Sequence, residues 1–431
     1  YLAQAGNRLA PNGALISGSD VSLITGSNLN NAGTLRATGS LLANVGGNLT
    51  NSGLMQAGGR LDLLSGNNLS NRAGGVIAGG DVNLAAGADL LNERTVTTHE
   101  SASSYRTERN DFVDSAARIE SANDLAMQAG GNVNNVGGVL KSGADTTVKA
   151  VGDVNITASK SLDSGAIGTR SNFTTIAQQG SVVEAGRDLH VIGGRDISAI
   201  ASQVEAKRDV NLIATRDLNA IAGANEQHST YNSKKIKSIE DHVQQVSSVI
   251  KAGGDATLSA GQNLQLVASQ VNAGNEAYLV SGKNLELKAA ENQDYSFYSK
   301  TKKTSQGKKF RLDETDAVNN VGSLVSAGKN STVVAGENLL LAGSAVTAEK
   351  GATQLAAGQD VSILAVTNSD SARHERKESK SSWGGLKSSK VQDKVDEKRT
   401  TALGSMVSGE TVTVAAKRDA TVTGSNLVST G

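Results

Sequence analysis

The sequence predicts an all-β fold, a β-solenoid of the parallel β-helix type, and two observations carry the prediction. First, one phrase recurs: a small residue and Gly, a spacer, Asp or Asn, alternating apolar residues, then a second Gly and a second Asp or Asn. Second, its longer offset is about 21 residues, as from Asp188 to Asp209 and from Gly253 to Gly274. A fixed period of about 20 residues is typical of one structural unit stacked on copies of itself.

Each repeat is expected to be one rung built from short strands. Its apolar residues alternate, as Leu264 and Leu266 do, which is the period of a strand with one buried face. The Gly-x-Asp and Gly-x-Asn steps are turn signals, because Gly accepts positive φ and Asp or Asn side chains bond their own backbone. We therefore expect two or three strands in every rung of about 20–21 residues. Copies of the phrase occupy residues 78–92, 185–199, 252–266, 273–287 and 327–341.

Asparagine recurs in the first part of the chain with the same period. Asn31, Asn51, Asn71 and Asn92 follow one another at intervals of about 20 residues. Stacked rungs would place these amides about 4.8 Å apart, where each can donate to its neighbour. We interpret the series as a structural Asn ladder rather than as a ligand site.

Arg-Asp dipeptides stand at five predicted turns. Stacked carboxylates would repel one another, and an Arg beside each can neutralise the carboxylate one rung away. An exposed pair of this kind contributes about 0–1 kcal/mol. We therefore interpret these residues as corner stabilisers and not as catalytic carboxylates. The dipeptides are Arg187-Asp188, Arg195-Asp196, Arg208-Asp209, Arg216-Asp217 and Arg418-Asp419.

The composition agrees with a solenoid. The 431 residues have a formal net charge of zero, 48 Gly, one Pro, no Cys and only 3% aromatic residues. A narrow solenoid core is filled by Val, Leu, Ile and Ala, whereas a globular enzyme of this length buries many large rings. The lack of Cys excludes disulfides and thiolate metal sites. No run of about 18 apolar residues predicts a transmembrane helix. Since the chain starts at Tyr1 without Met, we expect an internal piece of a longer protein.

Five segments interrupt the repeat within the single repeat domain of residues 1–431. They lie near 92–122, 159–180, 225–250, 291–322 and 368–406, so the interruptions are themselves nearly periodic. Rungs of one solenoid would launch such insertions from the same corner, so we expect them along one flank. Alternating Ser or Thr and aromatic or charged residues predict long β-hairpins. For residues 238–250, a short amphipathic helix is the alternative.

The insertions hold most of the residues able to contact a partner. Nine of the eleven aromatic residues and four of the five histidines lie in them, and residues 295–312 include six basic residues and no acid. One interpretation is that the hairpins only cover the rod, with the aromatic side chains as their own small core. The other is contact with a glycan, an anionic lipid headgroup or an outer-membrane protein, which aromatic and basic residues suit. The candidate contact residues are Tyr231, Tyr295, Phe297, Tyr298, Lys300, Lys302, Lys303, Lys308, Lys309, Phe310, Arg311 and Trp383.

Other classes of site find no support in the sequence. Nucleic acid is not expected as a partner, because the chain is neutral and acids such as Glu291 and Asp294 flank the basic run. No nucleophile elbow, P-loop or His-x-x-x-His motif is present. The Asp residues follow the repeat register, which marks them as turn residues. We therefore expect no enzyme, no cofactor and no metal site.

The repeat in residues 26–53, GSNLNNAGTLRATGSLLANVGGNLTNSG, resembles the filamentous haemagglutinin repeats of large bacterial two-partner-secretion exoproteins. From Ala185 onward the chain resembles the second haemagglutinin-repeat type of contact-dependent growth inhibition (CdiA-type) effectors. The segments that carry this second resemblance most clearly are HERKESKSSWGGLKSSK (374–390) and GSMVSGETVTVAAKRDATVTGSNL (404–427). Together the two resemblances cover nearly the whole chain.

The resemblance implies a right-handed parallel β-helix that is secreted through an outer-membrane partner barrel and displayed as an extracellular filament on a Gram-negative cell surface. In such effectors, the second repeat region lies between the receptor-binding part and a C-terminal toxin domain, and helps the toxin cross the target cell's outer membrane. The resemblance thus predicts a non-enzymatic segment whose partners are the rest of its polypeptide and the target envelope. An adhesin stalk and a polysaccharide-processing β-helix enzyme are the alternatives. The sequence that flanks this chain in the full-length protein would distinguish an effector from an adhesin.

Overall fold

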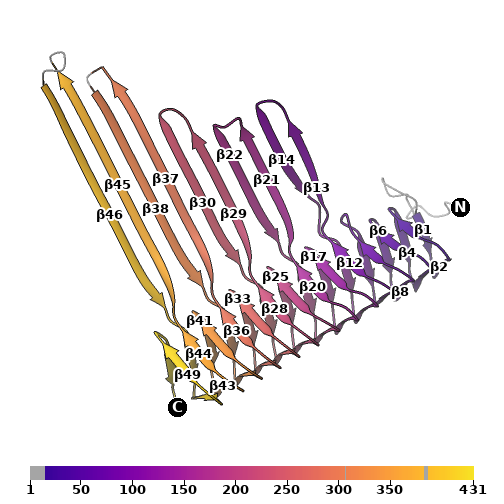
Figure 1. Cartoon of the computed structure of the whole chain (residues 1–431). Helices are drawn as coiled ribbons and strands as arrows, with labels where there is room; N and C mark the ends of the chain where they lie inside the picture. Colours follow the sequence, from indigo (N-terminus) through magenta and orange to yellow (C-terminus); the bar gives the residue numbers. More distant parts are fainter. Residues whose placement is uncertain (1–14, 306, 383–386) are drawn as a thin grey trace.

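The computed structural model describes residues 15–305, 307–382 and 387–431 and shows a parallel β-helix with hairpins standing along one flank (Figure 1). Each complete rung has three strands, which join three parallel sheets that run along the rod. The longest sheet has 14 strands, one from each rung. Where no hairpin intervenes, successive rungs are separated by the predicted period of about 20–21 residues. At about 4.8 Å per rung, the rod is about 62 Å long. Within the described residues, no helix is long and apolar enough to cross a membrane.

The first sheet contains the first strand of each rung. Its strands are β1 (Leu15–Gly18), β4 (Thr34–Ala37), β7 (Leu54–Ala57), β10 (Val76–Gly79), β15 (Arg118–Ser121), β18 (Val139–Ser142), β23 (Val182–Ala185), β26 (Gln203–Ala206), β31 (Val249–Ala252), β34 (Gln270–Ala273), β39 (Leu324–Ala327), β42 (Ala345–Ala348), β47 (Met406–Gly409) and β50 (Asn426–Ser429).

The second sheet has 13 strands. They are β2 (Val21–Thr25), β5 (Leu41–Val45), β8 (Arg60–Ser65), β11 (Asp81–Ala86), β16 (Leu125–Ala129), β19 (Thr146–Ala150), β24 (Leu189–Gly193), β27 (Val210–Ala214), β32 (Ala256–Ala260), β35 (Ala277–Ser281), β40 (Ser331–Ala335), β43 (Ala352–Ala357) and β48 (Thr411–Ala416).

The third sheet also has 13 strands. They are β3 (Leu29–Asn31), β6 (Leu49–Asn51), β9 (Leu69–Asn71), β12 (Leu90–Glu93), β17 (Val133–Val136), β20 (Val154–Thr157), β25 (Ile197–Ile200), β28 (Leu218–Ile221), β33 (Leu264–Val267), β36 (Leu285–Lys288), β41 (Leu339–Ala342), β44 (Val361–Leu364) and β49 (Ala420–Thr423).

Ten longer strands form five β-hairpins. They are β13 (Val96–Ala102) with β14 (Arg106–Val113), β21 (Ser159–Ile167) with β22 (Ser171–Gln179), β29 (Gly223–Asn232) with β30 (Ile236–Val246), β37 (Ala290–Thr304) with β38 (Gly307–Val321), and β45 (Val366–Ser382) with β46 (Lys387–Leu403).

The register between rungs follows the period read from the sequence. Leu41 pairs with Leu61, and Leu61 pairs with Val82 on the rung after it. Ser331 pairs with Thr353, one position farther along than the repeat predicts, and the corner that precedes Thr353 contains Gly351 at a φ of 141°. Gly accommodates this backbone conformation without steric cost.

The core is the stack of inward side chains from all three sheets. Leu264 and Leu266 are fully buried, as the alternation predicts, and the partners that stack on them across the third sheet are apolar. Leu, Val, Ile, Ala and Met supply the buried hydrophobic residues of the described chain, and none of these residues is aromatic. The parallel β-helix predicted from the repeat is therefore confirmed.

The Asn ladder predicted from the spacing is present. Asn31, Asn51, Asn71 and Asn92 each donate from Nδ2 to the Oδ1 of the next Asn at 2.7–2.9 Å, and the series continues to Asn135. All five side chains are buried. Because each amide also donates to a main-chain oxygen nearby, the buried polar atoms are hydrogen-bonded inside the rod.

A second ladder, which the repeat pattern did not predict, occupies the corner before the first strand of the later rungs. In six of its seven steps, the main-chain N–H of one Ser donates to the Oγ of the Ser one rung on, at 3.1–3.4 Å, the exception being the step from Ser248 to Ser269. All of these residues up to Ser405 are buried. The ladder consists of Ser181, Ser202, Ser248, Ser269, Ser323, Ser344, Ser405 and Ser425.

The Arg-Asp corners also behave as predicted, because each Arg reaches the carboxylate of the preceding rung. Arg195 contacts Asp153 at 2.7 Å, and Arg216 contacts Asp196 at 2.6 Å. The Asp145 carboxylate accepts hydrogen bonds from the Arg187 side chain and from the main-chain N–H of Asp188. These bonds lower the pKa of Asp145 to about 2. The remaining pairs are Arg208 with Asp188 and Arg418 with Asp360.

The alternative of a helix within residues 238–250 is wrong. Residues 236–246 form β30, which pairs with β29 on one side and β37 on the other. Two strand partners supply main-chain hydrogen bonds along both edges, which an isolated short helix could not match. Some hairpins are shorter than the insertions expected from the sequence. Asn92, the first residue of the expected insertion 92–122, belongs to β12 of the rod, and residues 249–250, the last of the expected insertion 225–250, belong to β31.

Candidate interaction surface on the hairpin sheet

The five hairpins pair edge to edge into one ten-stranded antiparallel sheet, here named the hairpin sheet. Each hairpin leaves the same corner of the rod, after a strand of the third sheet and before a strand of the first. Figure 1 shows the hairpins side by side, rising from the rod in chain order. The hairpin sheet is the part of the molecule that extends away from the solenoid.

The spacing of the hairpins explains why they join. They follow β12, β20, β28, β36 and β44, so one hairpin leaves at every second rung. Two rungs advance about 9.6 Å along the rod, and the two strands of a hairpin are also about 9.6 Å wide. Each hairpin therefore fills the space up to the next one, and β14–β21, β22–β29, β30–β37 and β38–β45 pair across the junctions.

The hairpins lengthen toward the C-terminal end of the rod. Their paired strands have 7 and 8, 9 and 9, 10 and 11, 15 and 15, and 17 and 17 residues. A strand as long as β45 spans about 58 Å, so the tips of the last hairpins stand far from the rod. Figure 1 shows the hairpins becoming longer toward the C-terminal end, with the tips of the last two standing highest.

Carboxamides clamp three of the junctions near the base of the sheet. The main-chain N–H of Gln178 donates to Asn225 Oδ1 at 2.8 Å, and the side-chain amide of Gln178 donates to the main-chain oxygen of Ala224 at 3.0 Å. The same two bonds recur in the next two junctions. These pairs are Gln245 with Asn292 and Glu291, and Asn320 with Asn368 and Thr367. The offsets of 47, 47 and 48 residues between bonded amides are the signal that the sequence analysis missed.

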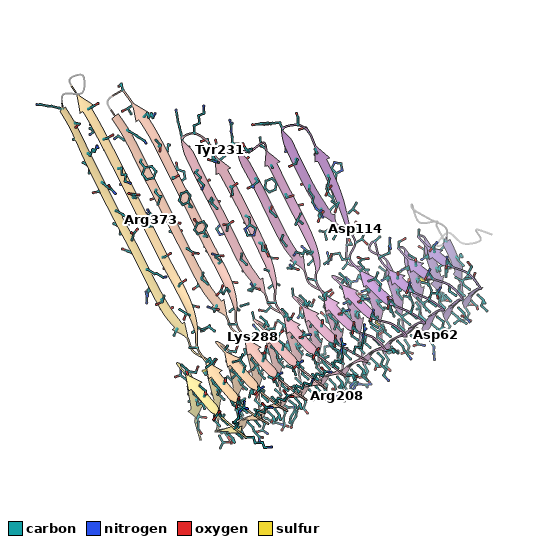
Figure 2. All side chains as sticks on the ribbon, viewed as in Figure 1. Asp62, Asp114, Arg208, Tyr231, Lys288 and Arg373 are labelled. Atoms are coloured by element: carbon teal, nitrogen blue, oxygen red, sulfur yellow. The ribbon has the colours of Figure 1, made fainter. Side chains whose placement is uncertain are left out.

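The candidate contact residues divide between two faces of the hairpin sheet, since directly paired residues share a face and successive residues alternate. The register places the two sets on opposite sides, and Figure 2 shows side chains on both sides of the strands. The Tyr231 face holds Tyr231, Tyr298, Lys300, Lys302, Lys309 and Arg311. The Tyr295 face holds Tyr295, Phe297, Lys303, Lys308 and Phe310. Trp383 lies outside the described residues.

On the Tyr295 face, each aromatic ring is engaged by a neighbouring side chain. Tyr295 donates its hydroxyl to Glu314 at 3.1 Å, and burial together with this carboxylate raises the pKa of Tyr295. Lys237 lies 5.4 Å from the centre of the Phe297 ring, and Lys377 lies 5.6 Å from that of Phe310. Such cation–π contacts stabilise the sheet locally. These three rings therefore already make stabilising contacts with other residues of the hairpin sheet.

On the Tyr231 face, cations gather toward the tips. Arg311 lies 6.0 Å from the centre of the Tyr298 ring. Lys300, Arg311 and Arg376 stand directly opposite one another on three neighbouring strands. Arg311 pairs with Asp313, whereas Lys300 and Arg376 form no ion pair with any described residue. Tyr231 is 39% exposed at the distal end of its hairpin (Figure 2).

Three histidines of the sheet each contact an Asp on an adjacent strand, and His228 also contacts Glu226 on its own strand. His228 lies 3.0 Å from Asp241 and 3.1 Å from Glu226, and these two hydrogen bonds raise the pKa of His228. His242 contacts Asp294 at 2.7 Å, and His374 contacts Asp313 at 3.0 Å. Among the described residues, no group of three or more His, Cys, Asp or Glu side chains is arranged to hold a metal ion. The histidine contacts tie strands together.

Comparisons with known proteins agree with this architecture. The family model described as "Hemagglutinin repeat" matches residues 164–239, 230–319 and 311–431, which include part of the second hairpin, the last three hairpins and the Ser ladder. No solved structure matches the chain.

Three curated relatives carry the name CdiA. The "16S rRNA endonuclease CdiA" of Enterobacter cloacae is 32% identical over 96% of the chain, and the "tRNA nuclease CdiA" of Escherichia coli is 29% identical over 87%. The "Deoxyribonuclease CdiA" of Dickeya dadantii is 31% identical over 63%. The chain spans only 13%, 12% and 8% of the length of these three relatives.

Proposed function

Because the chain belongs to the haemagglutinin-repeat family, we propose that it is a non-enzymatic, extracellular segment of a contact-dependent growth inhibition effector. Its hairpin sheet supports the delivery of a C-terminal toxin across the outer membrane of the target cell. The segment is exported through an outer-membrane partner barrel and displayed within a surface filament. Its partners are the rest of its own polypeptide, including the toxin, and the envelope of the target cell.

The observation that carries this proposal is the position of the hairpin sheet. A stalk needs only the rod, yet 10 of the described strands leave it and form a charged sheet whose tips lie far from the core. Loops and hairpins held by a rigid scaffold are the usual carriers of binding function. The relatives' names support the same proposal, because each relative is a CdiA and each is far longer than the segment it matches.

The nuclease activities in those names are assigned to the relatives and not to this segment. The carboxylates of the rod corners are occupied by arginines and main-chain N–H groups, as at Asp145 and Asp188. Such carboxylates stabilise turns and are poorly placed to act as acids or bases. The segment therefore serves as a scaffold for chemistry that another domain performs.

An adhesin stalk is the second candidate, and the N-terminal part of the rod favours it. The rungs from β1 through β9 launch no hairpin and are held by the Asn ladder, so this part is a plain rod. A plain rod suits a spacer that holds a binding domain away from the cell. The hairpin sheet, in contrast, has no role in a spacer.

The test uses the full-length effector with a shortened fourth hairpin. Residues 297–314 are replaced by Asn-Gly, which removes paired positions equally from β37 and β38. The matched control deletes residues 32–51, which make up one plain rung. We expect both variants to show normal surface display and receptor binding, and toxin entry into target cells to fall only in the hairpin variant. Normal toxin entry after hairpin shortening would contradict the proposal.

A further inference from the structure

Basic side chains line the distal edge of the hairpin sheet at every hairpin turn. This row, here named the basic rim, lies within or next to the turns that are farthest from the rod. All of its side chains are exposed. The basic rim consists of Arg106, Arg170, Lys234, Lys235, Lys302, Lys303, Lys308, Lys309, Lys380 and Lys387.

Most of these charges form no ion pair within the part of the chain that the structure describes. Arg106 pairs with Glu108 at 2.8 Å, and Lys309 and Lys380 share Glu378 at 3.1 Å. The other seven members of the basic rim form no ion pair with the described residues. Exposed lysines are ordinarily interspersed with acids, as they are over the chain as a whole, which carries 42 basic and 42 acidic residues.

The charge is concentrated in the two longest hairpins. Residues 299–311 and 376–394, which form their distal parts, contain twelve basic and two acidic residues. Lys302 stands directly opposite Lys309, and Lys303 stands opposite Lys308. Like charges at paired positions destabilise an antiparallel sheet. Folding therefore gains nothing from this pattern, whereas an external anion would relieve the repulsion.

Two hollows along the distal edge offer places for such anions. One, of about 750 Å³, lies between the second and third hairpin turns and is lined by Arg170, Lys234, Lys235 and Tyr231. Another, of about 460 Å³, is lined mainly by basic side chains, among them Lys300, Lys302, Arg311 and Arg376, with Glu378 and Asp393 as its acidic members. Clustered Lys and Arg side chains are the usual ligands of phosphate groups, Arg with two parallel hydrogen bonds and Lys as a point charge.

We propose that the basic rim docks on a membrane surface that carries phosphate groups, with the hairpin sheet standing edge-on to the membrane. Main-chain bonds fix the turns relative to neighbouring hairpins: Asn232 N–H donates to Arg170 O at 2.6 Å between the second and third turns, and Thr301 N–H of β37 donates to Lys235 O of the third turn at 2.7 Å. A row of cations along one edge of the sheet suits an anionic surface. Each Lys or Arg near such a surface adds to the attraction.

The acids behind the basic rim favour this orientation. Asp313, Glu314 and Asp316 lie on the same strand as the rim residues Lys308 and Lys309, closer to the rod. They would repel a polyanion that lay flat along a face of the sheet, as a nucleic acid would. A membrane touched only by the tips avoids them. The exposed Tyr105 and Tyr231 also lie near the tips, and Tyr suits the boundary between headgroups and water.

This inference rests on the proposed function only in naming the target cell's outer membrane as the surface, and the binding step is tested separately. The probe is the purified chain with vesicles of phosphatidylcholine, alone or mixed with phosphatidylglycerol, in a flotation assay. The rim variant replaces Lys234, Lys235, Lys302 and Lys303 with Glu. The matched control replaces the exposed rod residues Lys207, Lys283, Lys329 and Lys350 with Glu, an identical change in net charge.

We expect the chain to float with phosphatidylglycerol vesicles and not with phosphatidylcholine alone, and binding to weaken as salt increases. The rim variant should bind at least about 100-fold more weakly, since four cations near the surface are reversed, and the rod variant should bind like wild type. If the Glu variant fails to fold, a second rim variant carries Gln at the same four positions. Its loss of vesicle binding should be smaller, because the charges are removed and not reversed.

Three results would overturn the inference: no flotation of the wild type, equal losses in the rim and rod variants, or displacement from vesicles by a DNA duplex at equal phosphate concentration. The last result would make the basic rim a general polyanion site. A full-length effector with the rim variant separates the two proposals. Lost vesicle binding with normal toxin entry contradicts the delivery role and leaves membrane docking in place, whereas normal vesicle binding of the rim variant contradicts docking alone.

Discussion

The Ser181 hydroxyl donates a 2.7 Å hydrogen bond to the main-chain oxygen of Asn135. This contact joins the last member of the Asn ladder to the first member of the Ser ladder. On the rung after Asn135, the ladder position is taken by Ile156, so the core of the third sheet becomes apolar from there on. Between residues 135 and 181, the Asn ladder thus gives way to the Ser ladder as the stabilising element at this corner of the rod. The match to the haemagglutinin-repeat model begins within this interval, at residue 164.

Replacing Asn71 with Leu should destabilise the N-terminal rungs. Asn71 accepts from Asn51 and donates to Asn92 and to the oxygen of Gly75, so Leu leaves buried polar atoms without partners. A buried unpaired group costs about 1–3 kcal/mol, and we expect a loss of at least about 2 kcal/mol. Hydrogen exchange of the β6, β9 and β12 amides measures it. Ser70→Ala, which removes a hydroxyl group outside the ladder, is the control, and equal protection in the two variants would refute the ladder's contribution.

Neighbouring positions 263 and 264 should respond very differently to substitution. Leu264 is fully buried, so Leu264→Asp places an unpaired charge in a dry core and is severely destabilising. Asn263 donates from Nδ2 to Asp217 at 2.9 Å at a partly exposed corner. Asn263→Ser should cost about 1 kcal/mol, because Ser still serves a turn. Urea denaturation compares the two, and similar midpoints would contradict the register of the core.

Acid should weaken the Arg-Asp corners. The Arg187 hydrogen bond holds the pKa of Asp145 at about 2 in the folded chain, below its ordinary value of 3.8. A carboxylate with a lowered folded-state pKa contributes stability above its ordinary pKa, and this stability is lost as the pH falls from about 4 to about 2. We expect Arg187→Gln to reduce that loss, seen as a smaller change in urea midpoint between about pH 5 and about pH 2.5. Arg72→Gln, which removes an exposed Arg without an ion pair in the described chain, should leave the acid response unchanged.

The solenoid could be predicted from the sequence because its determinants are local and periodic. A Gly-x-Asp corner, an alternating run such as Leu264 and Leu266, and an Asn that returns once in each early rung all report the rung directly. The Ser ladder follows the same logic but was missed, because hairpins interrupt its spacing. Ser202 and Ser248, for example, are 46 residues apart although they occupy consecutive rungs.

The hairpin sheet was harder to foresee, because it depends on register between segments far apart in the chain. Composition identified Tyr298, Lys303 and Arg311 as one candidate surface. The pairing of β37 with β38 puts Tyr298 and Arg311 on one face and Lys303 on the other. A shift of one residue in that pairing would exchange the faces, and composition does not reveal such a shift. Arg376 joins the same row of cations from another hairpin. The residues next to Arg376 in the sequence do not indicate that it lies beside Arg311.

The match between two rungs and one hairpin leads to a test of the whole architecture. Deleting residues 248–268 removes one complete rung between the third and fourth hairpins and joins Ser247 to Ser269. The rod should reclose in register, because each rung contacts only its neighbours. The two hairpins would then leave adjacent rungs about 4.8 Å apart, although each needs about 9.6 Å. We therefore expect β30 to lose its partner β37, and the hairpin sheet to divide there.

The matched control deletes a whole period. Removing residues 248–322 takes out two rungs and the fourth hairpin together, so that the fifth hairpin leaves the rod two rungs after the third. The strand β45 then occupies the place of β37 beside β30, and the sheet closes again. Hydrogen exchange of the β30 amides distinguishes the variants: those directed at β37 should lose protection after the short deletion and keep it after the long one, even though the long one removes more of the protein. Protection that survives both deletions would show that the hairpins do not need the two-rung spacing to pair.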